Sequence, residues 1–191
     1  TLFDSVYLSR CLVMYNSIEQ HLKDFHICIF PIDDLCFNIL KSLSLQNTTV
    51  ISPEDFENED LLEVKKNRTK AEYCWTCSSS IIEYVLTNFK VPSCTYVDAD
   101  LFFYRSPIIL LEELSETKTV LITEHRYSFL ARYYEQKRAG RFCVQFITFT
   151  NDPESRLILS EWKNQCINWC YDRYEGGKFG DQKYLDEWPV K

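Results

Sequence analysis

Short apolar runs alternate along this chain with longer segments that show helical spacing or helix caps. The runs with the length and composition of strands are 25–30, 48–51, 94–97, 120–123 and 142–149. The clearest helical segments are 8–22, 72–89 and 153–169. This alternation predicts an α/β fold, in which helices cover both faces of a mixed, mostly parallel sheet.

The length and the apolar content of the chain fit one domain. The chain has 191 residues, of which 46% are apolar and 15% aromatic, and this is enough to build a sizeable core. We therefore expect a single domain over 1–191. Thr1-Leu2-Phe3 has the character of a strand end, and Trp188-Pro189 comes close to the last residue. We expect this domain to be incomplete at both ends.

The net charge bears on the expected partners, and the cysteine content bears on the expected location of the protein. The formal net charge is −7, whereas a protein that binds duplex nucleic acid normally presents a basic face, so nucleic acid is not expected. The nine cysteines are odd in number, and a chain of this length does not need disulfides to fold. Reduced thiols in a cytoplasmic protein are the simplest interpretation, and no signal-peptide pattern or membrane-spanning apolar run is visible.

Glycine is scarce, and its positions exclude two common ways of binding a nucleotide. The four glycines are at 140, 176, 177 and 180. A Walker loop and a GxGxxG loop both need closely spaced glycines at the end of a strand, because their backbones approach the phosphates directly. A nucleotide on this chain must therefore be bound in another way.

The pair Asp98 and Asp100 is the strongest candidate for chemistry. It follows the strand-like run that ends at Val97, and ligands of open α/β sheets lie beyond the carboxyl ends of strands. Carboxylate oxygens select Mg²⁺ or Mn²⁺, and these ions also bind phosphate oxygens. A metal at this place would act as a Lewis acid on a departing diphosphate. Asp-x-Asp alone is a common tripeptide that often caps a helix or forms a loop.

Four separated segments together resemble the GT-A glycosyltransferases. Residues 96–103 (Tyr-Val-Asp-Ala-Asp-Leu-Phe-Phe) look like the signature of that fold, whose nearest group is the bacterial sugar-nucleotide transferases related to glycosyltransferase family eight. Residues 4–8 resemble the first loop of that group, residues 72–77 the start of its long helix, and residues 180–185 its Gly-Asp-Gln segment. The order and spacing agree over almost the whole chain. The resemblance implies a Rossmann-like GT-A fold.

The resemblance also implies a role for each matching residue. Asp98 would contact the donor ribose or the metal, and Asp100 would be the main metal ligand, with Mn²⁺ or Mg²⁺ as the cofactor. Asp181 and Gln182 would hold sugar hydroxyls beside the anomeric carbon, with Gln182 stabilising that carbon in a transfer that retains configuration. Three further residues would bind the donor: Asp4 and Tyr7 border the base, and Arg68 offers a guanidinium to the diphosphate.

Two departures from the family pattern put the sugar subsite in question. The relatives usually carry Asn-Val-Gly after the aromatic at position 142, where this chain has Cys143-Val144-Gln145. At Cys143 a weak thiol donor therefore replaces an amide, and at Gln145 a bulky residue replaces a small one. Family-eight enzymes also place a histidine as a third metal ligand near the end of the domain, and no histidine follows Gly180 here.

The function implied is transfer of a hexose from a nucleoside-diphosphate sugar, with a UDP-sugar favoured, to a glycan or lipid-linked glycan. A lipid-linked acceptor leaves room for peripheral membrane association. One alternative is a haloacid-dehalogenase-type phosphatase, because Asp98, Asp100, Gly180, Asp181 and Asp186 have its spacing, although Phe102 departs from it.

Other interpretations of single features stay open. A catalytically impaired domain that only binds a nucleotide sugar is one, and a zinc module on Cys74, Cys77, Cys166 and Cys170 is another. Glu124 with Asp181 is a weaker carboxylate pair for acid–base chemistry. His125 follows Glu124 at a strand end and would be a surface or core residue unless it faces the cleft.

Overall fold

Six strands form two three-stranded sheets in the computed structural model, which describes residues 1–190, with Val190 described by its backbone alone. The first sheet has the order β1–β2–β3 and is parallel, with Leu2 opposite Phe30 and Ile29 opposite Val50. Its strands are β1 (Leu2–Phe3), β2 (Ile27–Pro31) and β3 (Thr48–Val50). The second sheet has the order β4–β6–β5 and is antiparallel. Its strands are β4 (Ser93–Val97), β5 (Val120–Glu124) and β6 (Phe142–Thr150).

The mixed pairing that the sequence predicts is confirmed, with the parallel pairs confined to the first sheet. The antiparallel sheet follows from the connection between β5 and β6. Glu124 at the end of β5 lies opposite Phe142 at the start of β6, so the chain returns beside the strand it has just left. An antiparallel return needs no crossover to the far end of the sheet. β6 then lies between β5 and β4, with Val97 opposite Phe146.

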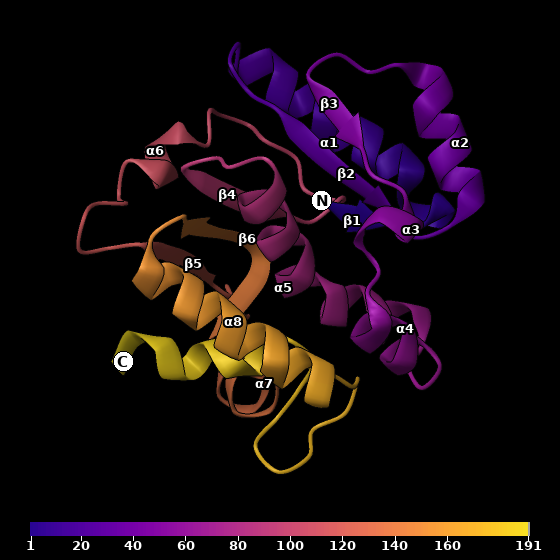
Figure 1. The fold of residues 1–191 in the computed structure, drawn as a ribbon. Coiled ribbons are helices and arrows are strands. Elements are labelled where there is room, and N and C mark those ends of the chain that lie inside the picture. The colour runs from indigo at the N-terminus through magenta and orange to yellow at the C-terminus, as the bar shows by residue number, and fades with distance from the viewer. Residues whose placement is uncertain (191) are drawn as a thin grey trace.

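Helices cover both faces of the sheets, as expected for an α/β fold (Figure 1). On one face α5 and α8 pack against β4 and β6, with Ile81, Phe149 and Trp162 in the core. On the other face α1 and α2 pack against β2, with Met14 and Leu40 in the core. The helices are α1 (Leu8–His21), α2 (Asp34–Leu43), α3 (Pro53–Phe56), α4 (Glu59–Lys65), α5 (Lys70–Asn88), α6 (Ile108–Leu111), α7 (Arg132–Ala139) and α8 (Pro153–Asn168), with the 3₁₀ helices η1 (Ser5–Tyr7) and η2 (Lys183–Val190).

Side-chain caps fix the starts of several helices. Ser52 and Asp55 form a capping box at the start of α3, with Pro53 in the first turn, and Asp152 caps α8. The start of α5 has a second box, made by Thr69 and Glu72. Helix α7 has no counterpart among the predictions, because Arg132–Ala139 is polar on nearly all sides and shows no apolar stripe.

Two structural findings bear on location and contacts with membranes. None of the helices within residues 1–190 has the length and apolar character needed to cross a bilayer. The nine cysteines are unpaired, and most are buried. The cytoplasmic location expected from the sequence stays a prediction.

Asp33 ties the first loop of the chain to α2. One carboxylate oxygen accepts a hydrogen bond from the Ser5 amide at 2.7 Å, and the other accepts one from the Cys36 amide at 2.8 Å. These bonds outweigh burial and lower the pKa of Asp33 below 3.8. The same carboxylate therefore caps α2 and holds the backbone beside Asp4.

We expect Asp33→Ala to lower the free energy of unfolding at neutral pH by about 2 kcal/mol, because it removes a helix cap and a second amide acceptor. Since the pKa is lowered in the folded state, this contribution is present above the unfolded pKa and is lost as the pH falls through the folded pKa. Urea titrations at pH 7 and pH 3 measure both effects. Asp34→Ala, at an exposed neighbour, is the matched control. An equal loss in the two variants would contradict the assignment.

Candidate functional site

The two aspartates of the Asp98-Ala99-Asp100 segment lie in a tight turn at the carboxyl end of β4. The Asp98 amide donates to the Gln145 carbonyl of β6 at 2.9 Å, and the Leu101 amide donates back to the Asp98 carbonyl at 3.3 Å. Ala99 is buried beneath the turn, whereas Asp98 is half-buried and Asp100 is exposed. The turn therefore leaves one carboxylate at the surface and the other directed inward.

The inward carboxylate of Asp98 is held by a buried tyrosine. The Tyr96 hydroxyl donates to Asp98 Oδ1 at 3.0 Å. Burial raises the pKa of Asp98, and the negative charge of Asp100 raises it further, although the bond from Tyr96 opposes this. Two carboxylates thus share one small region without a neutralising side-chain cation among their hydrogen bonds and ion pairs in residues 1–190.

Asp181 brings a third carboxylate to the same region from the far end of the chain. It is 5% exposed, and burial raises its pKa to about 7, with a further contribution from the charge of Asp98. Gly180 has a φ of 50°, and a Cβ there would lie 3.4 Å from the Trp75 ring, so glycine suits this close approach to α5. The Trp162 indole donates to the Asp181 carbonyl at 2.9 Å and fixes the backbone.

Gln182 and Cys143 flank this carboxylate group. The Gln182 side-chain amide donates to the Ala139 carbonyl at 2.8 Å, which links the segment 180–182 to the end of α7. The Cys143 thiol is 8% exposed, and burial raises its pKa to about 11. The charges of Asp98 and Asp181 contribute to that rise, so the thiol belongs to the same electrostatic environment and stays neutral.

The first loop of the chain forms the other wall. Asp4 caps η1 by accepting from the Val6 amide at 3.1 Å. Tyr7 is 39% exposed, and the Arg10 guanidinium lies over its ring at 4.3 Å from the centroid. A surface hollow of about 590 Å³ joins this wall to the metal-ligand candidate Asp100. The residues that line it are Tyr7, Ser9, Arg10, Val13, Asp100, Leu101 and Phe102.

Arg68 and Lys70 are two residues apart in the sequence but have different surroundings. Arg68 packs its guanidinium on the Tyr171 ring at 3.7 Å and donates to the Ile167 carbonyl at 3.4 Å. Lys70 is 77% exposed, and its Nζ lies 3.8 Å from Asp4 Oδ2. Spacing alone could not separate the two. Lys70 and Arg10 are the basic residues that the structure adds to the candidate site.

The remaining sequence candidates lie in ordinary structural surroundings. Glu124 is exposed and forms an ion pair with Arg141, and the His125 ring stacks on Tyr127 at 4.6 Å. Cys74 and Cys77 are in α5, whereas Cys166 is in α8 and Cys170 follows it. Within the described residues, no group of three or more His, Cys, Asp or Glu side chains is arranged to hold a metal ion.

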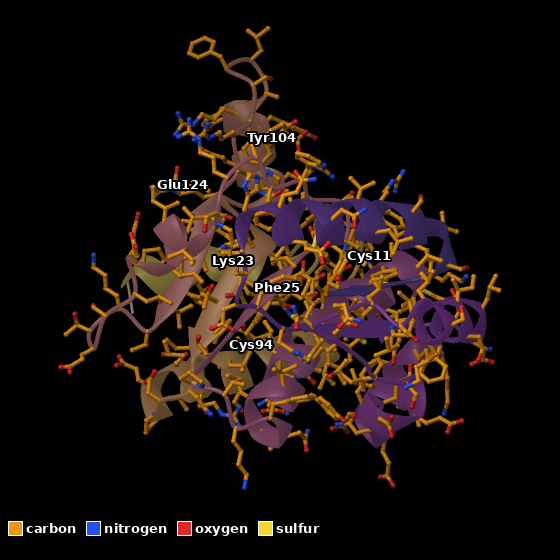
Figure 2. The ribbon with its side chains drawn as sticks, turned by 90° about the horizontal axis from the view of Figure 1, so that it is seen from above. Cys11, Lys23, Phe25, Cys94, Tyr104 and Glu124 are labelled. Atoms are coloured by element: carbon orange, nitrogen blue, oxygen red, sulfur yellow. The ribbon has the colours of Figure 1, made fainter. Side chains whose placement is uncertain are left out.

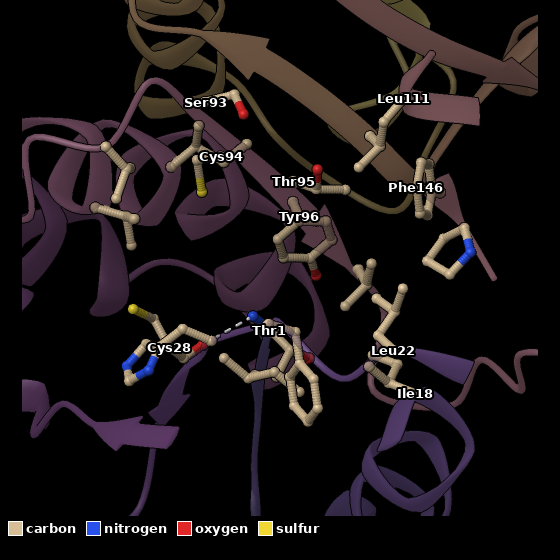
Figure 3. A pocket seen from close by; sticks show the side chains of 18 of the residues that line it. Thr1, Ile18, Leu22, Cys28, Ser93, Cys94, Thr95, Tyr96, Leu111 and Phe146 are labelled. Atoms are coloured by element: carbon tan, nitrogen blue, oxygen red, sulfur yellow. Dashed lines mark hydrogen bonds between the residues drawn. The ribbon is translucent and has the colours of Figure 1, made fainter. Parts of the chain in front are cut away.

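A second space in the protein is a mostly apolar cavity of about 390 Å³ between β2 and β4 (Figure 3). Cys94, Thr95 and Tyr96 line one side, and Cys28 lines the other. The Thr1 nitrogen donates to the Cys28 carbonyl at 3.1 Å. None of Asp98, Asp100 and Asp181 lines this cavity, so it is separate from the carboxylate group.

Comparison with known sequences gives two long matches. The chain is 28% identical to the uncharacterized protein YfnD of Bacillus subtilis (strain 168) over 194 residues, and 32% identical to YfnF of the same organism over 187 residues. These matches cover 99% and 94% of this chain, and the chain spans 61% of the length of each relative. No protein-family model matches the chain.

Comparison with solved structures confirms the fold. The chain superposes on the bifunctional glycosyltransferase WbbM with a TM-score of 0.60 and 14% identity, over 97% of this chain and 36% of WbbM. It superposes on the galactosyltransferase LgtC, in complex with donor and acceptor sugar analogues, with a TM-score of 0.58 and 15% identity, over 97% of this chain and 68% of LgtC. The expected α/β fold of the GT-A type is therefore confirmed.

We expect Asp181→Asn to change how stability depends on pH. The folded protein keeps the proton on Asp181 up to a pKa of about 7, whereas an ordinary aspartate has a pKa of 3.8. Stability from the protonated group is thus complete below the unfolded pKa and is lost as the pH rises through the folded pKa. Asp181→Asn should remove a slope of up to about 1.4 kcal/mol per pH unit in this window.

Urea unfolding between pH 4 and pH 8 measures that slope, without added divalent metal. Asp172→Asn, at an exposed aspartate nearby in sequence, should keep the slope of the unchanged protein. Parallel curves for Asp181→Asn and the unchanged protein would show that Asp181 is not the titrating group.

Proposed function

We propose that this chain transfers a hexose from a nucleoside-diphosphate sugar, with a UDP-sugar favoured, to a glycan or lipid-linked glycan. The observation that carries the proposal is that Asp98, at the carboxyl end of β4, is charge-coupled to both Asp100 and Asp181, and that Asp100 lines a hollow bounded by Tyr7 and Arg10. The fold shared with WbbM and LgtC supports the transferase class. The whole protein's acceptor and partners belong to the same proposal.

Asp98 and Asp100 are the residues that would hold a divalent metal. Their donor atoms are hard carboxylate oxygens. Burial, and after it the charge of Asp100, raises the pKa of Asp98, and a dication would stabilise its ionised form. The exposure of Asp100 leaves room for phosphate oxygens and water to complete the coordination. Mn²⁺ or Mg²⁺ there would supply Lewis-acid stabilisation of the negative charge on the leaving diphosphate. The third, histidine ligand of the family has no counterpart between Gly180 and Lys191, so it is missing or lies beyond Lys191.

The nucleotide would lie in the hollow between η1 and the Asp98–Leu101 turn. The exposed ring of Tyr7 can stack on the base. Asp4 lies on the same wall and forms an ion pair with Lys70, which keeps that cation beside the hollow. Arg10 and Lys70 can place positive charge near the diphosphate. LgtC, whose fold this chain shares, was solved with donor and acceptor sugar analogues. This supports a donor site in the corresponding cleft.

Asp181 and Gln182 would bind the donor sugar. With a pKa of about 7, Asp181 is partly protonated near neutral pH and can donate or accept a hydrogen bond with a sugar hydroxyl. The hydrogen bond from the Gln182 side-chain amide to the Ala139 carbonyl fixes the orientation of that amide. A solved variant of LgtC is described as an active-site mutant in which glutamine is replaced by glutamate. An active-site glutamine is the role we propose for Gln182, in a transfer that retains configuration.

Cys143 would replace the family's amide in the sugar subsite. Its neutral thiol is a weak donor, so this contact with the sugar is weaker than an amide would give. The buried position of Cys143 beside Asp98 and Asp181 nevertheless supports its place in the subsite. We propose that this replacement weakens the binding of one sugar hydroxyl. The second candidate function is therefore a catalytically impaired domain that binds a nucleotide sugar.

The phosphatase interpretation loses its support. A haloacid-dehalogenase-type enzyme needs its Asp-x-Asp after the first strand of its sheet, whereas Asp98 follows β4 at the edge of an antiparallel sheet. The similarity to glycosyltransferase folds covers 97% of the chain.

Asp100→Ala should abolish the Mn²⁺-dependent part of UDP binding, because it removes the exposed carboxylate ligand. The free energy of unfolding should change by less than about 0.5 kcal/mol, since Asp100 makes no internal packing contact to lose. Isothermal titration with UDP, with and without Mn²⁺, measures the binding. Glu116→Ala, at an exposed acid in another loop, is the control. Unchanged Mn²⁺-dependent UDP affinity in Asp100→Ala would overturn the assignment.

Lys70→Ala and Arg68→Ala separate the two candidate diphosphate ligands. We expect Lys70→Ala to weaken UDP binding about fivefold without loss of stability, because Lys70 is exposed beside Asp4. We expect Arg68→Ala to lower the free energy of unfolding by about 1–2 kcal/mol, because its guanidinium packs on Tyr171. If Arg68→Ala lost UDP affinity at unchanged stability while Lys70→Ala did not, the diphosphate-binding role would be assigned to Arg68.

A further inference from the structure

The connection between β5 and β6 carries the most exposed large apolar side chains of the described residues. Phe129 and Leu130 are each 93% exposed, and Tyr133 and Tyr134 are 83% and 68% exposed. The four lie within six consecutive positions, in and just before α7. Figure 2 shows this segment standing out from the body of the protein, beyond the labelled Tyr104. We call residues 125–139 the tip.

The tip is basic in an acidic protein. Residues 125–139 contain four cations and one acid, a net charge of +3, which leaves −10 on the rest of the chain. Within the described residues, Glu135 forms an ion pair with Arg138, at the base of the tip. The other three cations are exposed and have no ion pair there: Arg126, Arg132 and Lys137.

The base of the tip is fastened to the segment that carries Asp181. The Tyr127 hydroxyl donates to the Gly140 carbonyl at 2.9 Å, and Lys183 Nζ donates to the Gln136 carbonyl at 3.1 Å. Gln182 donates to the Ala139 carbonyl at 2.8 Å, and the Arg138 guanidinium lies over the Phe179 ring. A surface that binds the tip is therefore brought close to the proposed sugar subsite.

We propose that the tip is a membrane-docking element, which inserts Phe129, Leu130 and the two tyrosines into the headgroup region of an anionic bilayer. Aromatic and aliphatic side chains with flanking arginines and lysines are the combination that favours such an interface. Basic residues near an anionic surface are attracted to it, so the three exposed cations complement the lipid charge. The inference rests on exposure and charge and is independent of the proposed transferase activity.

Two other occupants fit the tip less well. A soluble glycan or small ligand is usually held in a concave site, whereas the tip projects outward. A second copy docked tip to tip would bring three unpaired cations against three others, and like charges repel in such a contact. An anionic lipid surface satisfies both the apolar and the charged side chains.

Vesicle co-sedimentation tests the proposal. The unchanged protein should bind phosphatidylcholine–phosphatidylglycerol vesicles and not phosphatidylcholine vesicles, with binding that weakens as salt is raised. The double variant Arg126→Glu with Arg132→Glu should weaken binding at least tenfold, because it removes two basic contacts with the lipid headgroups. Phe129→Ser with Leu130→Ser should weaken it by a similar factor. Lys23→Glu and Leu157→Ser, exposed residues away from the tip, are the matched controls and should bind as before.

Three results would overturn the proposal. The first is an absence of binding to the anionic vesicles at low salt, and the second is equal weakening in the tip and control variants. The third is a concentration-dependent dimer that Phe129→Ser with Leu130→Ser dissociates, which would assign the tip to a second copy. UDP binding with Mn²⁺, measured without vesicles, should be unchanged in every tip variant, so failure here is distinct from failure of the transferase assignment.

Discussion

Carboxyl groups placed on both sides of the partly buried Asp98 set the constraint on which the site depends. Burial raises the pKa values of Asp98 and Asp181, and repulsion of Asp98 by Asp100, and of Asp181 by Asp98, raises them further. Backbone ties to β6 and α8 hold Asp98 and Asp181 in place against this repulsion. A dication beside them would turn the same arrangement from unfavourable to favourable. This is the physical reason to connect the group with metal-supported binding of a diphosphate.

The aromatic part of the core supports the backbone of the segment that carries Asp181. Phe149 of β6 stacks on Trp162, and the Trp188 ring meets both edge-on. The Trp162 indole donates from this cluster to the Asp181 carbonyl. Asp98 is bonded through its amide to β6, the strand that also carries Cys143. The same strand therefore sets the positions of two site residues that are far apart in sequence, Asp98 and Cys143. The tip, in contrast, is joined to the site only through its base, and its exposed side chains are free to meet another surface.

Some features of the site and the fold could be predicted from the sequence, and others could not. Asp98 and Asp100 could be placed at a strand end from local pattern alone, and the helix starts at Ser52 and Asp152 could be predicted from their caps. Arg68 and Lys70 could not be told apart, because their roles depend on Tyr171 and Asp4, which lie far away along the chain. Helix α7 gave no signal, because it buries almost no apolar stripe. The exposure of Phe129 and Leu130 could not be predicted, since apolar residues are ordinarily expected in the core.

The sequence by itself determined the alternation of strands and helices, the absence of a glycine-rich phosphate loop, and the pair of carboxylates after β4. These features depend on hydrophobic period, caps and neighbouring residues, all of which are local. Only the tertiary structure decided that Asp181 joins that pair, that β4, β6 and β5 are antiparallel, and that a basic apolar tip stands out from the body. Burial, charge coupling and strand partners depend on residues distant in the chain, so no local pattern could fix them.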